Sequence, residues 1–155
     1  MTEFKDKIIL ITGGSRGIGK SIAELLNNDG ATVIVTYKNS IDEEYFKSKN
    51  ISYYKCDVAD ENSVKEMVDA IIKEHTKIDV LVNNAGVAID NPIFSATLED
   101  FEKSFQTNLR ATWYLTKRLS RFMIRNKSGR IINISSIIAH TGNPTQSAYG
   151  LTKAA

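Results

Sequence analysis

The sequence predicts an α/β fold in which a doubly wound parallel sheet lies between two layers of helices. Short aliphatic and β-branched runs, typical of strands buried on both faces, alternate along the chain with segments of helical periodicity. Such alternation favours βαβ units with right-handed crossovers. Ligands of these sheets bind beyond the carboxyl ends of the strands, where the strand order reverses. We therefore expect functional residues directly after the first, fourth and fifth strands.

The hydrophobic pattern assigns the strands and the first helices. The predicted strands are Ile8–Ile11, Thr32–Thr36, Ile51–Lys55, Ile78–Val82 and Arg130–Ile134. The apolar residues that recur at helical spacing after the first strand are Ile18, Ile22, Leu25 and Leu26. This first helix should end at Gly30, a typical C-cap residue. The polar segment 39–50 leaves room for only a short helix.

Capping residues mark the later helices. Asp60 can cap a helix whose apolar face covers residues 64–72. Thr97 and Asp100 resemble a capping box, which predicts one long helix continuing through Leu119. After a loop, a further helix is expected to begin at Ser147.

The composition favours one domain over residues 1–155 and a cytoplasmic setting. With 155 residues and 42% hydrophobic content, the chain can bury one core and is too short for two ordinary domains. Its 20 basic and 18 acidic side chains are interspersed, which gives no reason to expect nucleic acid or a membrane surface as partner. No apolar run approaches the roughly 20 residues of a membrane helix. The single cysteine, Cys56, favours a reducing compartment, and His75 and His140 lack the partners of a metal site.

A glycine-rich turn, Thr12–Gly19, joins the first strand to the first helix. Its glycines at positions 13, 17 and 19 permit a tight turn and close backbone approach to a pyrophosphate. The helix N-terminus offers free N–H groups and the positive end of a dipole. An ordinary βα turn that uses glycine for its dihedral angles is the alternative, but the strand–turn–helix context favours a nucleotide phosphate site.

The spacing T-G-x-x-x-G-x-G in this turn resembles that of the short-chain dehydrogenase/reductase family. The further segments that resemble the family, in its order, are Cys56-Asp57-Val58, Asn83-Asn84-Ala85-Gly86, Ser135-Ser136 and Tyr149-Gly150-Leu151-Thr152-Lys153. The resemblance runs from about Lys7 to the last residue and implies a Rossmann-type domain. Family members usually continue with further strands, so it also implies that residues 1–155 form a C-terminally incomplete version of that domain.

The end of the second strand bears on the choice of nicotinamide cofactor. Dinucleotide folds that bind NAD place an acidic residue there for the ribose 2′-hydroxyl, whereas this chain has Tyr37 followed by Lys38. Lys38 and Arg16 would attract a 2′-phosphate, unless Lys38 is simply a solvated loop lysine. We therefore predict NADP(H) rather than NAD(H). The residues expected to bind the cofactor, several of them by resemblance, are Gly13, Ser15, Arg16, Gly17, Ile18, Gly19, Tyr37, Lys38, Asp57, Val58, Asn84, Ala85, Gly86, Tyr149 and Lys153.

Tyr149 and Lys153 lie one helical turn apart and share one helix face. A tyrosine hydroxyl is a poor acid–base catalyst at neutral pH, but a nearby ammonium favours the phenolate. Tyr149 can then protonate a carbonyl oxygen during reduction or deprotonate an alcohol during oxidation. The resemblance implies that Lys153 also bonds the nicotinamide ribose, that Ser136 polarises the substrate carbonyl, and that Asn108 holds a water in the proton relay. The alternative for Asn108 is a polar helix residue that faces a neighbour.

Within the family the chain is most similar to the 3-oxoacyl-acyl-carrier-protein reductases, through its glycine turn, the segment Gly129–Ser136 and Gly142-Asn143-Pro144. The similarity implies NADPH-dependent reduction of a carbonyl to a secondary alcohol. The implied substrate is a 3-oxoacyl thioester of fatty acid synthesis, either a small molecule or bound to an acyl carrier. It also implies a homo-oligomer, a dimer or tetramer. Relatives acting on sugars, steroids or small alcohols share most of these residues. A noncatalytic NADP(H)-binding remnant is the rival from another class, and the presence of all four candidate catalytic residues argues against it.

Overall fold

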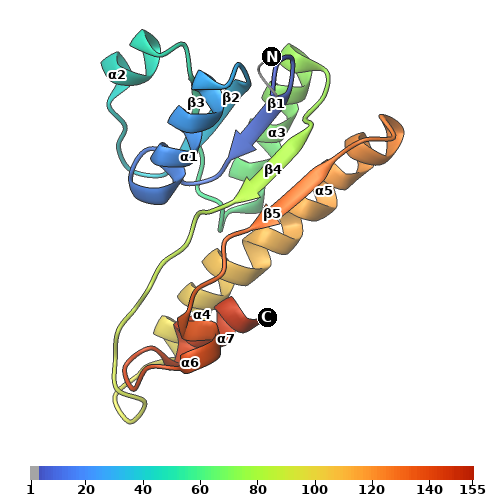
Figure 1. Cartoon of the computed structure of the whole chain (residues 1–155). Coiled ribbons are helices and arrows are strands. Elements are labelled where there is room, and N and C mark those ends of the chain that lie inside the picture. The colour runs from blue at the N-terminus through green and yellow to red at the C-terminus, as the bar shows by residue number, and fades with distance from the viewer. Residues whose placement is uncertain (1–3) are drawn as a thin grey trace.

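The chain forms a five-stranded parallel sheet with helices on both faces (Figure 1). The computed structural model describes residues 4–155. The elements in chain order are β1 (Ile8–Ile11), α1 (Gly17–Asn28), β2 (Thr32–Tyr37), α2 (Glu43–Ser48), β3 (Ser52–Lys55), α3 (Glu61–His75), β4 (Val80–Asn83), α4 (Leu98–Phe105), η1 (Gln106–Arg110), α5 (Ala111–Arg125), β5 (Arg130–Asn133), α6 (Ile138–Thr141) and α7 (Ser147–Ala154). The strand order is β3-β2-β1-β4-β5, so the order reverses between β1 and β4. The predicted doubly wound parallel fold is confirmed.

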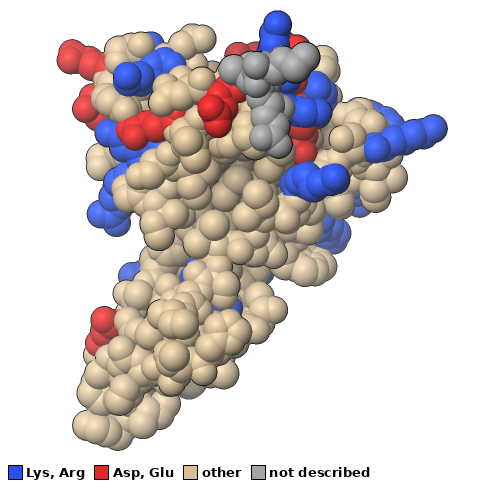
Figure 2. Space-filling model, viewed as in Figure 1, with Lys and Arg blue, Asp and Glu red and all other residues tan. Residues whose placement is uncertain are grey.

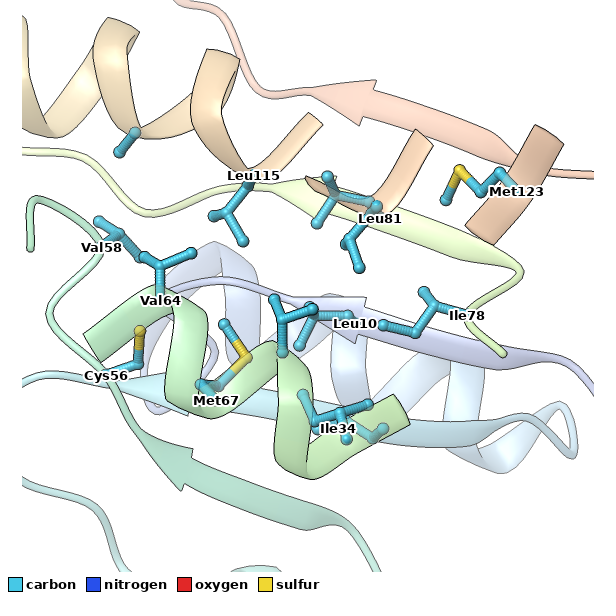
Figure 3. Packing of buried hydrophobic residues seen from close by; sticks show 14 residues of the cluster. Leu10, Ile34, Cys56, Val58, Val64, Met67, Ile78, Leu81, Leu115 and Met123 are labelled. Atoms are coloured by element: carbon cyan, nitrogen blue, oxygen red, sulfur yellow. The ribbon is translucent and has the colours of Figure 1, made fainter. Parts of the chain in front are cut away.

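Two apolar cores lie on opposite faces of the sheet, because neighbouring residues of a strand point to opposite sides. On one face Leu10, Ile34 and Leu81 pack against α3 and α5 (Figure 3). On the other face Ile9, Val33 and Val35 pack against α1 and α2. The central strands are therefore covered on both sides, which explains their continuous apolar sequence.

The predicted caps form as expected. The Asp60 side chain accepts hydrogen bonds from the N–H groups of Asn62 and Ser63 at the start of α3. Thr97 and Asp100 form a reciprocal capping box at the start of α4. These local hydrogen bonds satisfy N–H groups that the first helical turn leaves without a partner.

The helix that we expected to run unbroken through Leu119 is divided. α4 ends at Phe105, a π-helical turn (η1) follows, and α5 begins at Ala111. The π turn carries Asn108 into the interior, where its side chain is 5% exposed. Such single π turns often occur at functional sites. The apolar spacing along the helix did not reveal this interruption.

The first helix presents a narrower buried face than its apolar spacing suggests. Gly19 and Ala23 are buried, while Ile18 and Leu25 are 64% and 62% exposed. The helix backbone lies so close to the segment after β4 at Gly19 that a Cβ built there would be only 2.5 Å from the Asn84 Nδ2 atom. Small residues thus face the sheet, and Ile18 and Leu25 turn away from it.

The strand β5 forms an open edge of the sheet, and all four of its residues are exposed. The chain continues from β5 into α6, which lies in a segment predicted to be a loop, and then into α7. Helices α4, α6 and α7 gather beyond the carboxyl ends of β4 and β5 (Figure 1). On the face shown in Figure 2, charged side chains lie mainly over the sheet, and this helical region shows few. Within residues 4–155 no helix has the length and apolar character needed to cross a bilayer.

Candidate cofactor and active site

The glycine turn after β1 is built so that no side chain covers the start of α1. Gly13 and Gly17 have φ angles of +63° and +56°, a left-handed conformation that favours glycine. A Cβ on Gly14 would lie 2.6 Å from the Val35 Cβ, so the turn also packs directly on β2. The residue before α1, Arg16, makes no side-chain cap, and the first turn holds no acidic residue. The free N–H groups and positive dipole end therefore suit a phosphate group.

Asn84 and Thr12 tie this turn to the end of β4. The Asn84 side-chain amide donates to the carbonyl oxygens of Thr12 and Gly13, at 2.9 and 3.0 Å. In return, the Thr12 hydroxyl accepts from the N–H groups of Asn84 and Ala85, each at 3.0 Å. The four bonds bridge the point where the strand order reverses. They hold the turn in place before any ligand binds.

A cavity of about 280 Å³ opens beside the turn, at the carboxyl ends of the strands. The predicted cofactor residues that line it are Gly13, Ser15, Arg16, Tyr37, Lys38, Asp57, Val58, Ala85 and Gly86. The remaining lining residues, which the sequence did not single out for this site, are Thr36, Asn39, Ser40, Cys56 and Thr107. The predicted residues outside the lining are Gly17, Ile18, Gly19, Asn84, Tyr149 and Lys153. The residues present fit a dinucleotide, since a glycine cradle and a polar cleft meet at one sheet edge.

Two charged residues that line the cavity form an ion pair with each other. The Lys38 ammonium lies 2.7 Å from a carboxylate oxygen of Asp57. Burial acts to raise the pKa of Asp57, but Lys38 and the backbone N–H of Ala59 outweigh it, and the net shift is downwards. Asp57 is therefore a carboxylate at neutral pH. Lys38 thus combines an ion pair with a side chain that is 59% exposed, so the alternative of a solvated loop lysine stays open.

The candidate catalytic residues lie outside the cavity lining, on η1, on α7 and on the segment after β5. Lys153 donates from its ammonium to the Ile134 carbonyl oxygen at 2.8 Å, and burial lowers the pKa of that ammonium. The Ser135 hydroxyl donates to the Lys153 carbonyl oxygen at 2.7 Å, so α7 is bound to the chain that leaves β5. The Ser136 hydroxyl accepts from the N–H of Ile138 at 3.3 Å. Tyr149 is half-buried on α7, one turn before Lys153.

Asn108 links three segments of this region. Its Oδ1 accepts from the Val87 N–H at 2.8 Å, and its Nδ2 donates to the Val87 carbonyl oxygen at 2.9 Å. The same Nδ2 donates to the Thr152 hydroxyl at 3.0 Å, and that hydroxyl donates to the Tyr149 carbonyl oxygen at 2.8 Å. The side chain of Asn108 thus holds α7 against the segment after β4, as the alternative of a polar residue facing a neighbour describes.

Gly86 is the point where the cofactor cavity and the candidate catalytic residues meet. It lines the cavity, and a Cβ built on it would lie 3.2 Å from Asn108 Oδ1 and 3.4 Å from Lys153 Nζ. A side chain at this position would press on both groups. The structure therefore brings Gly86, Asn108 and Lys153 together from three separate segments.

Sequence reasoning missed three threonines that organise the site. Thr12 and Thr152 are buried, and each joins two segments through its hydroxyl. Thr36 is also buried, and its hydroxyl accepts from the Gly13 N–H at 3.2 Å. The sequence did offer signals for these threonines. Thr12 and Thr36 are polar residues at the ends of buried strands, and Thr152 lies inside a recognised motif. Within residues 4–155 no three His, Cys, Asp or Glu side chains gather as a metal site would require.

Residues 7–155 match the protein family described as short chain dehydrogenase, and the chain belongs to that family. The membership expected from the ordered motifs is confirmed.

The chain is similar to the 3-oxoacyl-[acyl-carrier-protein] reductase FabG of Staphylococcus epidermidis, at 37% identity over 96% of this chain and 64% of the relative. It is 39% identical to the reductase of the same name from Haemophilus influenzae, over 96% of this chain and 62% of that protein. A solved structure described as ElxO with NADP bound superposes with a TM-score of 0.89 at 35% identity, covering 96% of this chain and 63% of that one. The chain thus spans less than two thirds of the length of these relatives.

Proposed function

We propose that the chain is the cofactor-binding and catalytic part of an NADP(H)-dependent carbonyl reductase. The observation that carries the proposal is the meeting at Gly86, where the nucleotide cavity reaches the Lys153 ammonium and the Asn108 amide. Such a junction places groups that bind a nucleotide beside groups suited to proton transfer. A purely nucleotide-binding protein has no need of the second set.

The glycine turn and the strand ends would hold the cofactor. The N–H groups at the start of α1 suit the pyrophosphate, and Arg16 and Lys38 suit a 2′-phosphate. A solved relative with NADP bound supports this choice over NAD. When bound, the cofactor supplies a hydride, and the protein supplies orientation and a proton.

Tyr149 is proposed as the proton donor to the substrate carbonyl oxygen. The Lys153 ammonium on the same helix face favours the phenolate that remains after the transfer. Ser136, on the segment after β5, is proposed to hydrogen-bond the same carbonyl and polarise it. Asn108 would fix the position of α7 through Thr152 and is proposed to support the relay that returns a proton to Tyr149.

The substrate is proposed to be a 3-oxoacyl thioester, free or on an acyl carrier. The support is similarity to reductases whose names state this substrate, over nearly the whole of this chain. Reduction of the 3-oxo group gives a secondary alcohol. The whole protein would act as a homo-oligomer, in the cytoplasm.

The test is NADPH and NADH binding to the 155-residue chain by fluorescence titration, followed by turnover of a 3-oxoacyl thioester. Tyr149→Phe should lower kcat by about 10²–10⁴-fold, because proton transfer is lost, and leave the Kd of NADPH unchanged. Tyr114→Phe, which removes a hydroxyl from α5, is the matched control and should retain turnover. NADPH binding without turnover in the wild-type chain would support the noncatalytic reading instead. Retained turnover in Tyr149→Phe would overturn the proposed mechanism.

A further inference from the structure

The ion pair between Lys38 and Asp57 lies on the rim where a ribose phosphate would have to enter. Lys38 directly follows β2, and Asp57 follows the neighbouring strand β3. The N–H of Cys56 donates to the Tyr37 carbonyl oxygen at 2.8 Å, which keeps the two strand ends side by side. Their side chains are therefore brought into contact by the strand pairing itself.

The side chains of Asp57 and Lys38 differ in mobility. Asp57 is held by its own turn, because its carboxylate accepts from the Ala59 N–H at 3.1 Å and its N–H donates to the Ser63 hydroxyl at 3.1 Å. Lys38 has a flexible stem, and 59% of its side chain is exposed. A ligand that approaches the rim therefore meets a fixed carboxylate and a movable ammonium.

The charged groups that line the cavity are Arg16, Lys38 and Asp57. Within residues 4–155 Arg16 makes no ion pair, whereas Lys38 is already paired. A phosphate monoester carries close to two negative charges at neutral pH. It would need the Lys38 ammonium that Asp57 holds.

Building on the proposed NADP(H) site, we infer that Asp57 limits the preference for NADP(H) by competing with the 2′-phosphate for Lys38. Asp57 is then a specificity-determining residue even though it carries the same sign of charge as the phosphate. Binding of the phosphate exchanges one anionic partner of Lys38 for another. The 2′-phosphate therefore adds less to the affinity than it would if both cations were unpaired.

The experiment compares two nucleotides that differ only in the 2′-phosphate, 2′,5′-ADP and 5′-AMP, by calorimetric titration. Asp57→Asn should tighten 2′,5′-ADP binding relative to 5′-AMP binding by about three- to tenfold, the scale of one exposed ion pair. Asp69→Asn is the matched control, since Asp69 forms a comparable surface ion pair with Arg118 at 3.0 Å outside the cavity. It should change neither affinity.

A second background separates competition for Lys38 from direct repulsion of the phosphate. In Lys38→Gln the ammonium is absent, so the further change Asp57→Asn should gain less than about twofold. An equal gain in both backgrounds would overturn the competition. Equal weakening of both nucleotides by Asp57→Asn would also overturn it, because Asp57 would then contact the adenosine. A wild-type chain that binds neither nucleotide would overturn the proposed function as well. A chain that binds both nucleotides, but whose affinity for 2′,5′-ADP does not respond to Asp57→Asn, would overturn this inference alone.

Discussion

The strands β1 and β2 and the edge strand β5 belong to one sheet but are held in different ways. In β1 and β2 most residues are buried between two helical layers, and Gly14 of the glycine turn packs directly on Val35. In β5 every residue is exposed, and the helix α7 beyond it is held by a few polar bonds from Ser135, Lys153 and Asn108. The nucleotide side thus combines close packing with the Thr12–Asn84 hydrogen bonds, whereas the position of α7 on the candidate catalytic side depends more on polar bonds to neighbouring segments.

We therefore expect the two sides of the proposed site to respond to different substitutions. In a closely packed core, a change in side-chain volume of even one methylene group alters stability. A helix held by few polar bonds tolerates changes in volume but loses its position when one bond is removed. Substitutions matched in chemistry and placed on the two sides test this contrast directly.

The largest expected effect comes from truncating a core isoleucine. Ile34→Ala in β2, where Ile34 is fully buried, should lower the free energy of unfolding by about 2–5 kcal/mol. Ile132→Ala in β5, where Ile132 is 48% exposed, should lower it by less than about 1 kcal/mol. Urea denaturation followed by circular dichroism measures both. Similar losses for the two variants would show that β5 is packed as tightly as β2.

A glycine-to-alanine pair sharpens the contrast at helix positions. Gly19→Ala in α1 should cost about 2–3 kcal/mol, because its Cβ would meet Asn84 and the Gly13 carbonyl oxygen within 2.6 Å. Gly150→Ala in α7 meets nothing closer than 3.5 Å and should stabilise the chain by about 0.5–1 kcal/mol through helix propensity. Thermal unfolding ranks the two. A destabilising Gly150→Ala would mean that α7 is more closely packed than described.

The smallest expected effect is on acid stability. Asp79 accepts from the Ile8 N–H at 2.9 Å and pairs with Lys77 at 3.0 Å, at the amino ends of β1 and β4. Burial alone would raise the pKa of Asp79, but these two partners lower it below its ordinary value of 3.8. A lowered folded-state pKa contributes stability above pH 3.8 that is lost as the pH falls through the folded-state value. Asp79→Asn should therefore lose less stability than the wild-type chain across that window. The measurement is the urea midpoint of unfolding at a series of acidic pH values. The same pH dependence in Asp79→Asn and in the wild-type chain would contradict this role.

Much of the fold was predictable because its signals are local. The apolar runs located all five strands, and Asp60 and the Thr97–Asp100 box located the starts of α3 and α4. The glycine spacing located the turn that lines the cavity. In each case the relevant physics, periodicity, capping or dihedral freedom, acts between residues close in sequence.

The parts of the site that escaped prediction depend on residues distant in sequence. Asn108 and Thr152, which share a hydrogen bond, are 44 positions apart, and their pairing requires the π turn that no apolar pattern reports. The exposure of Ile18 follows from the close contact of Gly19 with Asn84, which directly follows β4.

The fold class, the family and the positions of the candidate residues could be inferred from the order of residues alone, because motif spacing and hydrophobic period are properties of short segments. Which of these residues touch became clear only from the folded chain. It paired Lys38 with Asp57 and Asn108 with Thr152, and it brought Lys153 to Gly86. Those contacts follow from strand order and helix packing, which set distances between segments that the order of residues does not specify.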